Sequence, residues 1–595
     1  MDAKLRKQLM EMLVRYGIRG ETDVEQVPFF PQKTDCFSTR IPESNTRCST
    51  PEAEGVSSLV LSEMLQSFER HKAANLHTVS VFRHGKLISE ATAKGYSTTT
   101  WRVTHSIAKT VTALAIGQLI DEGKLSLSDK VVDILADQCP PRLHRYTKDI
   151  TVYHLLSMSA GVVGLSETTA VVEADWTKAF LESVPAFAPG TAFKYNSMNT
   201  YMLSVILHTV SGKTLSEWLG EKLFRPLGIA NYLCEKGPEG IEKGGWGMYI
   251  APRDMAKIGQ LILQKGMWEG EQIVSEKWVS LMTKKAFSTG DSHGHFYYGL
   301  HIWVSPTERT YLMSGMLGQN VWICPETNVV AVLTAGNKEV FEKTEILQIL
   351  DETLGDASKI SKTPLKKDKK SYRTLRQTEA DFWECHRFVT LLPKKNKCLR
   401  LLYRLLKKDP TPLPEEINAF KGCYRFRQNN AGILPLFCRF MQNNHTKGIS
   451  RLLFLRKGNR FFVVFEEGEE RHTVEVGFYQ KALGQLNFKG EPYVIRAAGE
   501  CGITEDGAPV LKIELLFPEL SNTRYIKIYP EEGKLRLQLT ESPGREMIEG
   551  MVAEFVPESL RAGGIMGFLR AKMFGVDPLT CIGPITEPVL YAEKE

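Results

Sequence analysis

The amino-acid sequence predicts an α+β domain, made of one antiparallel sheet and a helical region, followed by an all-β domain. Strand-like patterns occur at 79–90 and again at 298–333, with helical patterns between them. Both ends of the first domain should therefore contribute strands to one antiparallel sheet. Beyond residue 410, strand-like runs are separated by Gly and Asn turns, which predicts a barrel or a sandwich.

The length and composition of the chain are those of a soluble globular protein with several domains. A chain of 595 residues is too long for one ordinary core. Its 43% hydrophobic and 24% charged content is typical of globular proteins. The net charge of +6 is small, and no array of Arg and Lys with interleaved aromatic residues occurs. We therefore expect no nucleic-acid partner.

Changes in composition divide the chain into four parts. Residues 1–50 combine a short amphipathic helix with a proline-containing loop, and we expect them to pack as an extension on the first domain. That domain spans 51–355, a basic linker and helix follow at 356–410, and a β-rich domain spans 411–595. The pattern of a basic amphipathic helix at 394–408 favours a solvated connector over a helix lying on an anionic membrane.

Local patterns predict the individual elements. Two strands within 79–90 meet at a His-Gly turn, and apolar residues at helical spacing predict a helix over 111–120 that stops at Gly123. Later strands are expected at 298–303, 320–324, 329–333, 461–465 and 511–515.

The sequence lacks the patterns of secreted and membrane-spanning proteins. The N-terminus is charged and amphipathic, without an apolar core segment or a small-residue cleavage site. No stretch approaches the roughly 18 apolar residues of a membrane span. The 11 cysteines are odd in number and scattered, without a Cys-x-x-Cys pair, which indicates reduced thiols. We expect a cytoplasmic protein without stable membrane insertion; its oligomeric state is not predicted.

A hydroxyl and an amine are expected one helical turn apart at Ser106 and Lys109. Both lie directly before the predicted helix, on one of its faces. A serine hydroxyl is a poor nucleophile unless a base takes its proton, and a semi-buried amine can be that base. Serine and lysine also recur at this spacing by chance, and Ser106 could simply cap the helix.

The segment 189–201 offers groups for a second proton transfer. Tyr195 can relay a proton where the charge of Lys109 favours the phenolate, and Ser197 or Asn199 can hold the lysine by hydrogen bonding. A Pro-Gly turn followed by a polar helix start explains the same residues.

Patterns for other chemistry are weaker. His293, His295 and His301 could supply imidazoles to a metal, but a polar loop entering a strand explains them better. No G-x-S-x-G, H-E-x-x-H or phosphate-loop signature occurs. We expect neither a metal ion nor a cofactor.

Six motifs follow one another between about residues 50 and 340. They are Ser106-x-x-Lys109, Thr151–Gly161, Pro189–Tyr195, Phe224–Ile229, Gly244–Gly247 and Arg253–Gly259. In this order and spacing they resemble the serine β-lactamase-related hydrolases, which include class C β-lactamases, DD-peptidases, family VIII esterases and nylon-oligomer hydrolases. The resemblance implies a β-lactamase/DD-peptidase-like first domain, and the second domain loosely resembles the lipocalin-like β modules of some relatives.

The resemblance also implies a role for each matching residue. Ser106 would be the acylated nucleophile, Lys109 its base partner and Tyr195 the second proton carrier. The Tyr-x-Asn motif of the family reads Tyr195-Asn196-Ser197 here. The hydroxyl of Ser197, or else the amide of Asn199, would then orient the lysine.

The family's third motif, Lys-Thr-Gly or His-x-Gly on a strand, is altered. The best match is Met316-Leu317-Gly318, the other register is Met313-Ser314-Gly315, and neither holds a basic residue. A methionine cannot form the charge-assisted hydrogen bond that holds a substrate carboxylate in the family's β-lactamases. We expect weak or no β-lactamase activity and neutral substrates. Residues expected to support the substrate or the oxyanion are Ser197, Asn199, Ser314, Gly315, Met316, Gly318 and Gln319.

Two functions remain open. The first is a serine hydrolase that acts on a small ester, amide or peptide through an acyl-enzyme on Ser106. The second is a catalytically silent protein of the same fold that binds a ligand or a peptide, since two motifs are altered. The joint presence of nucleophile, base and proton carrier favours the first. The β-rich domain could recruit a partner or cover the pocket.

Overall fold

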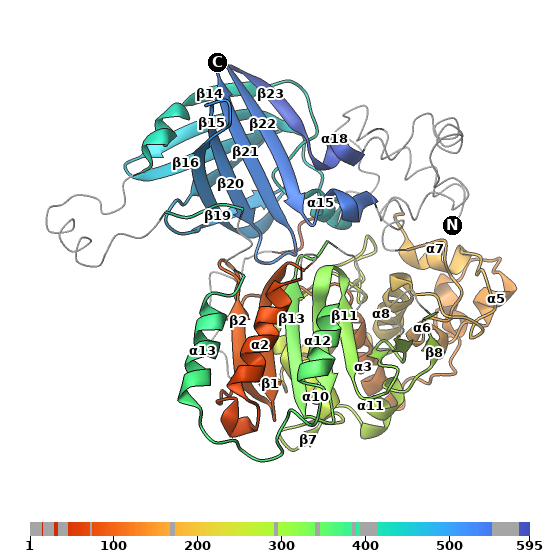
Figure 1. Ribbon diagram of the computed structural model, residues 1–595. Helices are drawn as coiled ribbons and strands as arrows, with labels where there is room; N and C mark the ends of the chain where they lie inside the picture. Colours follow the sequence, from red (N-terminus) through yellow and green to blue (C-terminus); the bar gives the residue numbers. More distant parts are fainter. Residues whose placement is uncertain are drawn as a thin grey trace, which may run out of the picture. The chain divides into compact units, whose positions relative to one another are not determined.

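The computed structural model describes residues 15, 29–33, 46–71, 74–166, 170, 173–290, 296–338, 345–383, 388–392, 413–549 and 582–595. The chain forms two compact units (Figure 1). The first draws its described residues from 37–384, and the second draws them from 385–595 together with residues before 37. The predicted order, an α+β unit followed by an all-β unit, is confirmed.

An antiparallel sheet of eight strands forms the centre of the first unit, in the order β2-β1-β13-β12-β11-β10-β9-β8. Strands β1 (Leu76–Arg83) and β2 (Lys86–Thr92) form the predicted hairpin, and β1 also pairs with β13 (Val329–Ala335) from the far end of the unit. The predicted closure of one sheet by both ends is therefore confirmed. The other strands are β8 (Phe287–Ser288), β9 (Tyr297–Tyr298), β10 (Trp303–Val304), β11 (Tyr311–Gly315) and β12 (Gln319–Cys324).

The single strand predicted at 298–303 is wrong. Strand β9 ends at Tyr298 and β10 begins at Trp303, and the N–H of Gly299 donates to the carbonyl of Ile302 at 2.8 Å across the intervening turn. A Cβ on Gly299 would lie 2.1 Å from the carbonyl oxygen of Met282, so only glycine fits. The turn directs His301 into the interior, with a left-handed φ of 59°.

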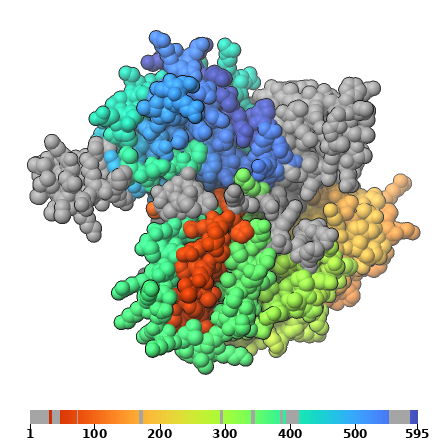
Figure 2. All heavy atoms as spheres, in the orientation of Figure 1, coloured from red at the N-terminus to blue at the C-terminus, as the bar shows by residue number. Residues whose placement is uncertain are grey.

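Helices cover both faces of this sheet. Helices α12 (Glu345–Thr353) and α13 (Lys369–Ala380) flank α2 (Ser58–Glu69) on one face, as Figure 2 shows. Helix α10 (Pro252–Leu263) packs on the other, where Gly259 lets Val321 and Val330 approach closely. Strands β1 and β13 are buried along their whole length in consequence.

Helix α13 lies within the segment predicted as a basic linker. Its Leu375 is fully buried in the core of the first unit, and the carboxylate of Glu379 accepts from the hydroxyl of Ser89 on β2 at 2.6 Å. Residues 369–380 are therefore part of the first unit. The predicted helix at 394–408 lies outside the described residues.

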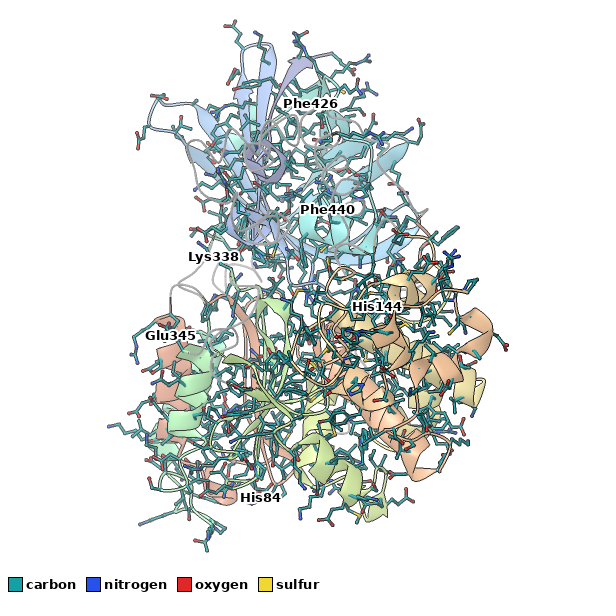
Figure 3. All side chains as sticks on the ribbon, turned by 90° about the vertical axis from the view of Figure 1, so that its right-hand side faces the viewer. His84, His144, Lys338, Glu345, Phe426 and Phe440 are labelled. Carbon is teal, nitrogen blue, oxygen red and sulfur yellow. The ribbon has the colours of Figure 1, made fainter. Side chains whose placement is uncertain are left out.

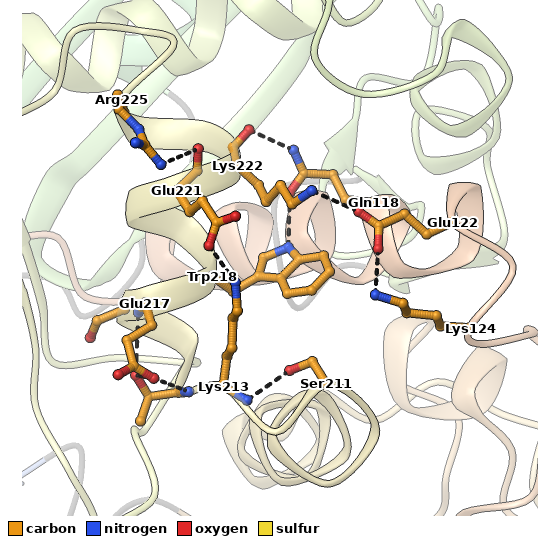
Figure 4. Close-up of polar contacts among 12 residues, drawn as sticks. Gln118, Glu122, Lys124, Ser211, Lys213, Glu217, Trp218, Glu221, Lys222 and Arg225 are labelled. Carbon is orange, nitrogen blue, oxygen red and sulfur yellow. Dashed lines mark hydrogen bonds and ion pairs between the residues drawn. The ribbon is translucent and has the colours of Figure 1, made fainter.

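The predicted helix after Ser106 is α3 (Ile107–Asp121), which is buried from Ile107 to Leu119. Its C-terminal end is fixed to a neighbouring helix by polar contacts (Figure 4). The amide of Gln118 donates to the carbonyl of Lys222 and accepts from the indole N–H of Trp218, both at 3.0 Å, and Lys222 pairs with Glu122 at 3.1 Å. These contacts fix the axis of the helix that carries Ser106 at its other end.

The remaining elements of the first unit are shorter, apart from α8 (Ser197–Ser211), which packs on α3 and α6. The helices are α4 (Val131–Ile134), α5 (Arg145–Lys148), α6 (Val152–Leu156), α7 (Trp176–Glu182), α9 (Leu215–Leu219) and α11 (Glu276–Met282). The strands of two small sheets are β3 (Arg102–Val103), β4 (Tyr232–Cys234), β5 (Met248–Ile250), β6 (Met267–Trp268) and β7 (Glu271–Gln272).

The second unit is a nearly closed barrel of ten antiparallel strands, in the order β17-β16-β15-β14-β23-β22-β21-β20-β19-β18. It also holds helices α15 (Leu436–Gln442), which the sequence did not predict, and α18 (Ile582–Thr586). Phe426 of β14 and Phe440 of α15 lie toward opposite ends of the barrel (Figure 3). The strands are β14 (Gly422–Phe426), β15 (Ile449–Lys457), β16 (Arg460–Glu467), β17 (Glu470–Val476), β18 (Ala482–Phe488), β19 (Glu491–Ile503), β20 (Pro509–Leu516), β21 (Thr523–Glu531), β22 (Lys534–Ser542) and β23 (Val589–Lys594).

The N-terminal residues 29–33 belong to the barrel unit. The N–H groups of Gln32 and Lys33 donate to the carboxylate of Glu491, and the Lys33 ammonium lies 3.5 Å from Glu519. The prediction that the N-terminal extension packs on the first domain is therefore wrong for these residues, because their polar partners lie in the barrel. In the part of the chain that the structure describes, no helix is both long and apolar enough to cross a bilayer.

Candidate active site

Ser106 and Lys109 meet at the N-terminal end of α3. The N–H of Thr104 donates to the carbonyl of Met248 at 2.8 Å, which holds the chain in place before the helix starts. The ammonium of Lys109 then reaches the hydroxyl of Ser106 at 2.8 Å. Ser106 stands at the N-cap position of the helix but makes no capping hydrogen bond with its side chain. The alternative that Ser106 serves as a helix cap therefore lacks support.

A second hydroxyl contacts the same ammonium. Ser197, the first residue of α8, accepts from Lys109 Nζ at 2.9 Å. Asn196 caps this helix by accepting from the N–H of Met198 at 2.9 Å. The amide of Asn199 instead donates to the sulfur of Met158 at 3.3 Å. Of the two groups predicted to orient the lysine, Ser197 makes the contact and Asn199 supports the packing of the helix.

A backbone carbonyl provides a third partner that the sequence analysis missed. Lys109 donates to the carbonyl of Gly245 at 2.8 Å, and Thr112, one turn further along α3, donates to the carbonyl of Gly244 at 2.9 Å. A Cβ on Gly244 would lie 2.1 Å from the hydroxyl oxygen of Ser204. The glycine-rich motif 244–247 was the signal in the sequence, because only a glycine fits this approach to α8.

A buried ion pair holds the glycine-rich motif from the other side. Lys243 Nζ lies 2.7 Å from a carboxylate oxygen of Glu235, and the hydroxyl of Tyr249 donates to the same carboxylate at 3.0 Å. The N–H of Gly245 donates to the carbonyl of Lys243 at 2.6 Å. The carbonyl that receives Lys109 is thus fixed through the backbone of Lys243.

Tyr195 forms an aromatic wall beside the lysine. Its ring centroid is 4.8 Å from Lys109 Nζ, and the ring stacks on Trp303 at 5.6 Å and meets the edge of Tyr298 at 6.0 Å. The side chain is half-buried, whereas Lys109 is only 1% exposed. The three residues predicted to carry the chemistry, Ser106, Lys109 and Tyr195, therefore lie together.

The third motif occupies the end of strand β11. A Cβ on Gly315 would lie 2.3 Å from the carbonyl oxygen of Thr104, so the strand passes directly against the residues that precede Ser106. Met313, Ser314 and Gly315 lie in this strand, whereas 316–318 form a 3-10 turn with Leu317 at a φ of 64°. The strand register is therefore Met313-Ser314-Gly315, and the register first favoured, Met316-Leu317-Gly318, is wrong. Met313 is fully buried and Ser314 is half-buried.

Gln319 and Gly318 shape the turn after this strand. The amide of Gln319 donates to the carbonyls of Leu317 at 3.1 Å and Ala335 at 2.7 Å. Gly318 has a φ of 85°, and a Cβ there would lie 2.5 Å from the amide nitrogen of Asn337. These contacts fix both predicted site residues in the turn that follows β11.

Two neutral imidazoles adjoin the lysine. Burial, together with the charges of Arg102 and Lys109, lowers the pKa of His105 to about 3. Burial and the charge of Lys109 likewise lower the pKa of His301 to about 3. His105, directly before Ser106, also has a left-handed φ of 48°. Neither imidazole adds positive charge to the site at neutral pH.

The contacts of His301 are not those of the metal site considered from the sequence. Its Nε2 lies 2.9 Å from the hydroxyl of Thr200, and its carbonyl accepts from Thr110 at 2.6 Å. His293 and His295 lie outside the described residues. Across the ranges that the structure describes, no group of three or more His, Cys, Asp or Glu could hold a metal ion.

Known proteins resemble this chain in sequence or in fold. The sequence model of the family described as Beta-lactamase matches residues 66–352. The chain is 26% identical over 284 residues to the 6-aminohexanoate-dimer hydrolase of Paenarthrobacter ureafaciens, an alignment that covers 42% of this chain and 70% of that protein. A putative 6-aminohexanoate-dimer hydrolase from Bacillus anthracis superposes with a TM-score of 0.44 at 20% identity, over 60% of this chain and 94% of that one. A family VIII carboxylesterase gives a TM-score of 0.42 at 18% identity, over 52% and 98%.

The first unit is thus a domain of the β-lactamase/penicillin-binding-protein type. The resemblance to the serine β-lactamase-related group that the motifs indicated is therefore confirmed for this domain. The relative from Paenarthrobacter ureafaciens is named as a hydrolase.

Proposed function

We propose that the first unit is a serine hydrolase that cleaves a small ester or amide through an acyl-enzyme on Ser106. One observation carries the proposal: a buried lysine amine lies 2.8 Å from the Ser106 hydroxyl and 2.9 Å from the Ser197 hydroxyl. The Lys109 amine also donates a hydrogen bond to the backbone carbonyl of Gly245. Burial disfavours the charged form of an amine, and Lys109 is only 1% exposed. In the neutral form Lys109 can take the proton of the Ser106 hydroxyl.

The reaction then proceeds by two acyl transfers. Ser106 Oγ forms a bond to the substrate carbonyl carbon as its proton passes to Lys109, and the oxyanion accepts hydrogen bonds from the backbone N–H groups of Ser106 and Met316. The proton passes through Tyr195 to the leaving group, whose bond to the carbon breaks. Water attacks the acyl-enzyme, gives up a proton by the same route, and releases the acid and free Ser106.

The lining of the site favours a neutral substrate. Met313 occupies the strand position at which the family's β-lactamases carry a basic residue, and it is fully buried. The half-buried ring of Tyr195 lies beside Lys109 and stacks on the buried Trp303. The aromatic surface of Tyr195 and the methionine at the third motif favour an uncharged acyl group. Short amides are included because a relative is named 6-aminohexanoate-dimer hydrolase.

Intact-mass analysis tests the nucleophile. The wild-type chain, Ser106→Ala and the control Ser204→Ala are incubated with a fluorophosphonate, with activated esters and with penicillins. Ser204 lies on α8 and is also buried, but it has no role in the proposed reaction. We expect a one-to-one adduct with the fluorophosphonate and esters on wild type and Ser204→Ala, and none on Ser106→Ala.

Two outcomes would contradict the proposal. An adduct on Ser106→Ala would move the nucleophile to another residue. A folded wild-type chain that no probe labels would favour the silent ligand-binding protein, since the pocket would then lack a reactive hydroxyl.

A further inference from the structure

The barrel holds a short N-terminal segment by its backbone. The N–H of Gln32 donates to Glu491 Oε2 at 2.5 Å, and the N–H of Lys33 donates to Oε1 at 3.2 Å and to Oε2 at 3.1 Å. One carboxylate at the start of β19 thus contacts two successive peptide groups. Contacts of this kind recognise two neighbouring backbone N–H groups whatever the side chains.

The side chain of Lys33 enters a site made for a cation. Its Nζ lies 3.5 Å from Glu519 Oε2, with both side chains fully enclosed, and 4.0 Å from the ring centroid of Tyr493. Glu519 is held in place because it also accepts from the N–H of Val494 at 2.9 Å. A carboxylate and an aromatic face around one ammonium form a recognition site for an amine.

The turn between β18 and β19 contacts the residues before the lysine. Gly490 has a φ of 84°, and a Cβ there would lie 3.3 Å from the ring of Pro31. Lys489 Nζ lies 5.4 Å from the ring centroid of Phe29. Four of the five residues 29–33 therefore contact one place on the barrel, whereas Phe30 is exposed.

The stability of the barrel should depend on residues 29–33, because they supply partners to two of its buried carboxylates. Glu491 is 2% exposed and Glu519 is completely buried. Departure of the segment would remove one cation and two N–H donors from two buried carboxylates. Removing one partner of a buried ion pair is strongly destabilising. An empty site would therefore bind another cationic segment of the same shape.

We propose that this end of the barrel is a peptide-recognition site for an unmodified lysine together with its own backbone N–H group and that of the preceding residue. Residues 29–33 occupy it within the same chain, and a lysine-bearing peptide of the same chemistry takes their place when they are weakened. Acetylation of the lysine would abolish recognition, because it removes the charge that Glu519 and Tyr493 contact. The proposal is independent of the proposed hydrolase activity.

Fluorescence anisotropy tests the site on the full chain carrying Lys33→Met. This substitution keeps the apolar stem of the side chain and removes its charge. A labelled peptide of residues 27–35 is expected to bind saturably, and peptides with norleucine or acetyl-lysine at the lysine position are expected to bind at least about tenfold more weakly. The double variant Lys33→Met/Glu519→Gln should lose this preference. Lys534→Met, at an exposed position of the same unit, should bind no better than wild type.

The result remains decisive if Lys33→Met does not fold. Refolding is then carried out with each peptide present, and recovery of a folded chain with the lysine peptide alone supports the site. The proposal is overturned if the folded variant binds no peptide, if the norleucine peptide binds equally well, or if neither peptide rescues an unfolded variant.

Discussion

The two units bury their lysines in opposite ways. In the first unit, Lys109 donates hydrogen bonds to the hydroxyls of Ser106 and Ser197 and to the carbonyl of Gly245. In the second, Lys33 lies against the carboxylate of Glu519 and an aromatic ring. A carboxylate stabilises the protonated amine, whereas a hydroxyl within hydrogen-bond distance can exchange a proton with it. The surroundings of Lys109 thus suit proton transfer, whereas those of Lys33 suit the binding of the N-terminal segment to the barrel.

The largest contrast is expected when each lysine is replaced by methionine. Lys109→Met should lower the rate of labelling at Ser106 by roughly 10²–10⁴-fold, because the base is lost. Lys33→Met should leave that rate unchanged and lower the thermal stability of the barrel, because Glu519 loses its cation. Labelling rates by mass spectrometry and thermal unfolding measure both effects. Labelling of Lys109→Met at the wild-type rate would contradict the proposed base.

A second buried pair extends the comparison within the barrel. Arg524 and Glu541 meet at 2.8 Å with both side chains fully enclosed. Arg524→Met is expected to destabilise the barrel by about 3–5 kcal/mol, because it leaves a buried carboxylate without its cation.

The matched control for this pair is Arg524→Met/Glu541→Gln. The glutamine keeps an acceptor for the N–H of Leu436, now 2.8 Å from the carboxylate, so the double variant should recover part of the loss. Urea unfolding of the full chain measures stability, and labelling at Ser106 should stay unchanged. A cost below about 1 kcal/mol for the single variant would show that the pair contributes little.

The sequence predicted the parts of the molecule that depend on local patterns. Helix α3 and the hairpin of β1 and β2 have clear apolar periods and turn residues, and the spacing of Ser106 and Lys109 follows from one helical turn. The break at 299–302 was missed because it depends on a left-handed His301, which hydrogen bonds from distant helices hold in place.

Long-range contacts account for the rest of what was missed. The carbonyl of Gly245 reaches Lys109 across 136 residues, and no spacing rule encodes a backbone acceptor. The register of the third motif depends on a turn that includes Leu317 with a positive φ, a conformation that its sequence does not indicate. The packing of the N-terminal segment on the barrel was missed because the partners of Lys33 lie more than 450 residues away in the sequence.

Acid should lower the stability of the first unit through two buried histidines and that of the second through one. The pKa values of His105 and His301 in the first unit, and of His445 in the second, are each lowered to about 3 by burial. The unfolded chain takes up these protons near the ordinary value of about 6.5. Stability is therefore expected to fall as pH decreases from about 6.5 toward 3, with two of these three histidines acting on the first unit.

His301→Asn isolates one of these contributions. Asparagine tolerates the left-handed backbone but does not titrate. The variant should start from a lower stability at pH 7, since the ring contacts are lost, and should then lose less between pH 7 and pH 5 than wild type. Unfolding temperatures at the two pH values measure the difference. An unchanged pH dependence would mean that His301 is not a neutral buried group in the native state.

The smallest expected effect concerns the cation that the first unit lacks at its third motif. Met313→Lys places an ammonium at the strand position beside Ser106, where it can hold a substrate carboxylate. The gain from a charge-assisted hydrogen bond is offset by the cost of burying the new charge, so acylation by penicillin relative to a neutral ester should rise by about tenfold. Met316→Lys, in the turn, is the matched control and should give no gain. If only Met316→Lys raised the relative acylation by penicillin, the third motif would be Met316-Leu317-Gly318. If neither variant raised it, the substrate carboxylate would not reach β11.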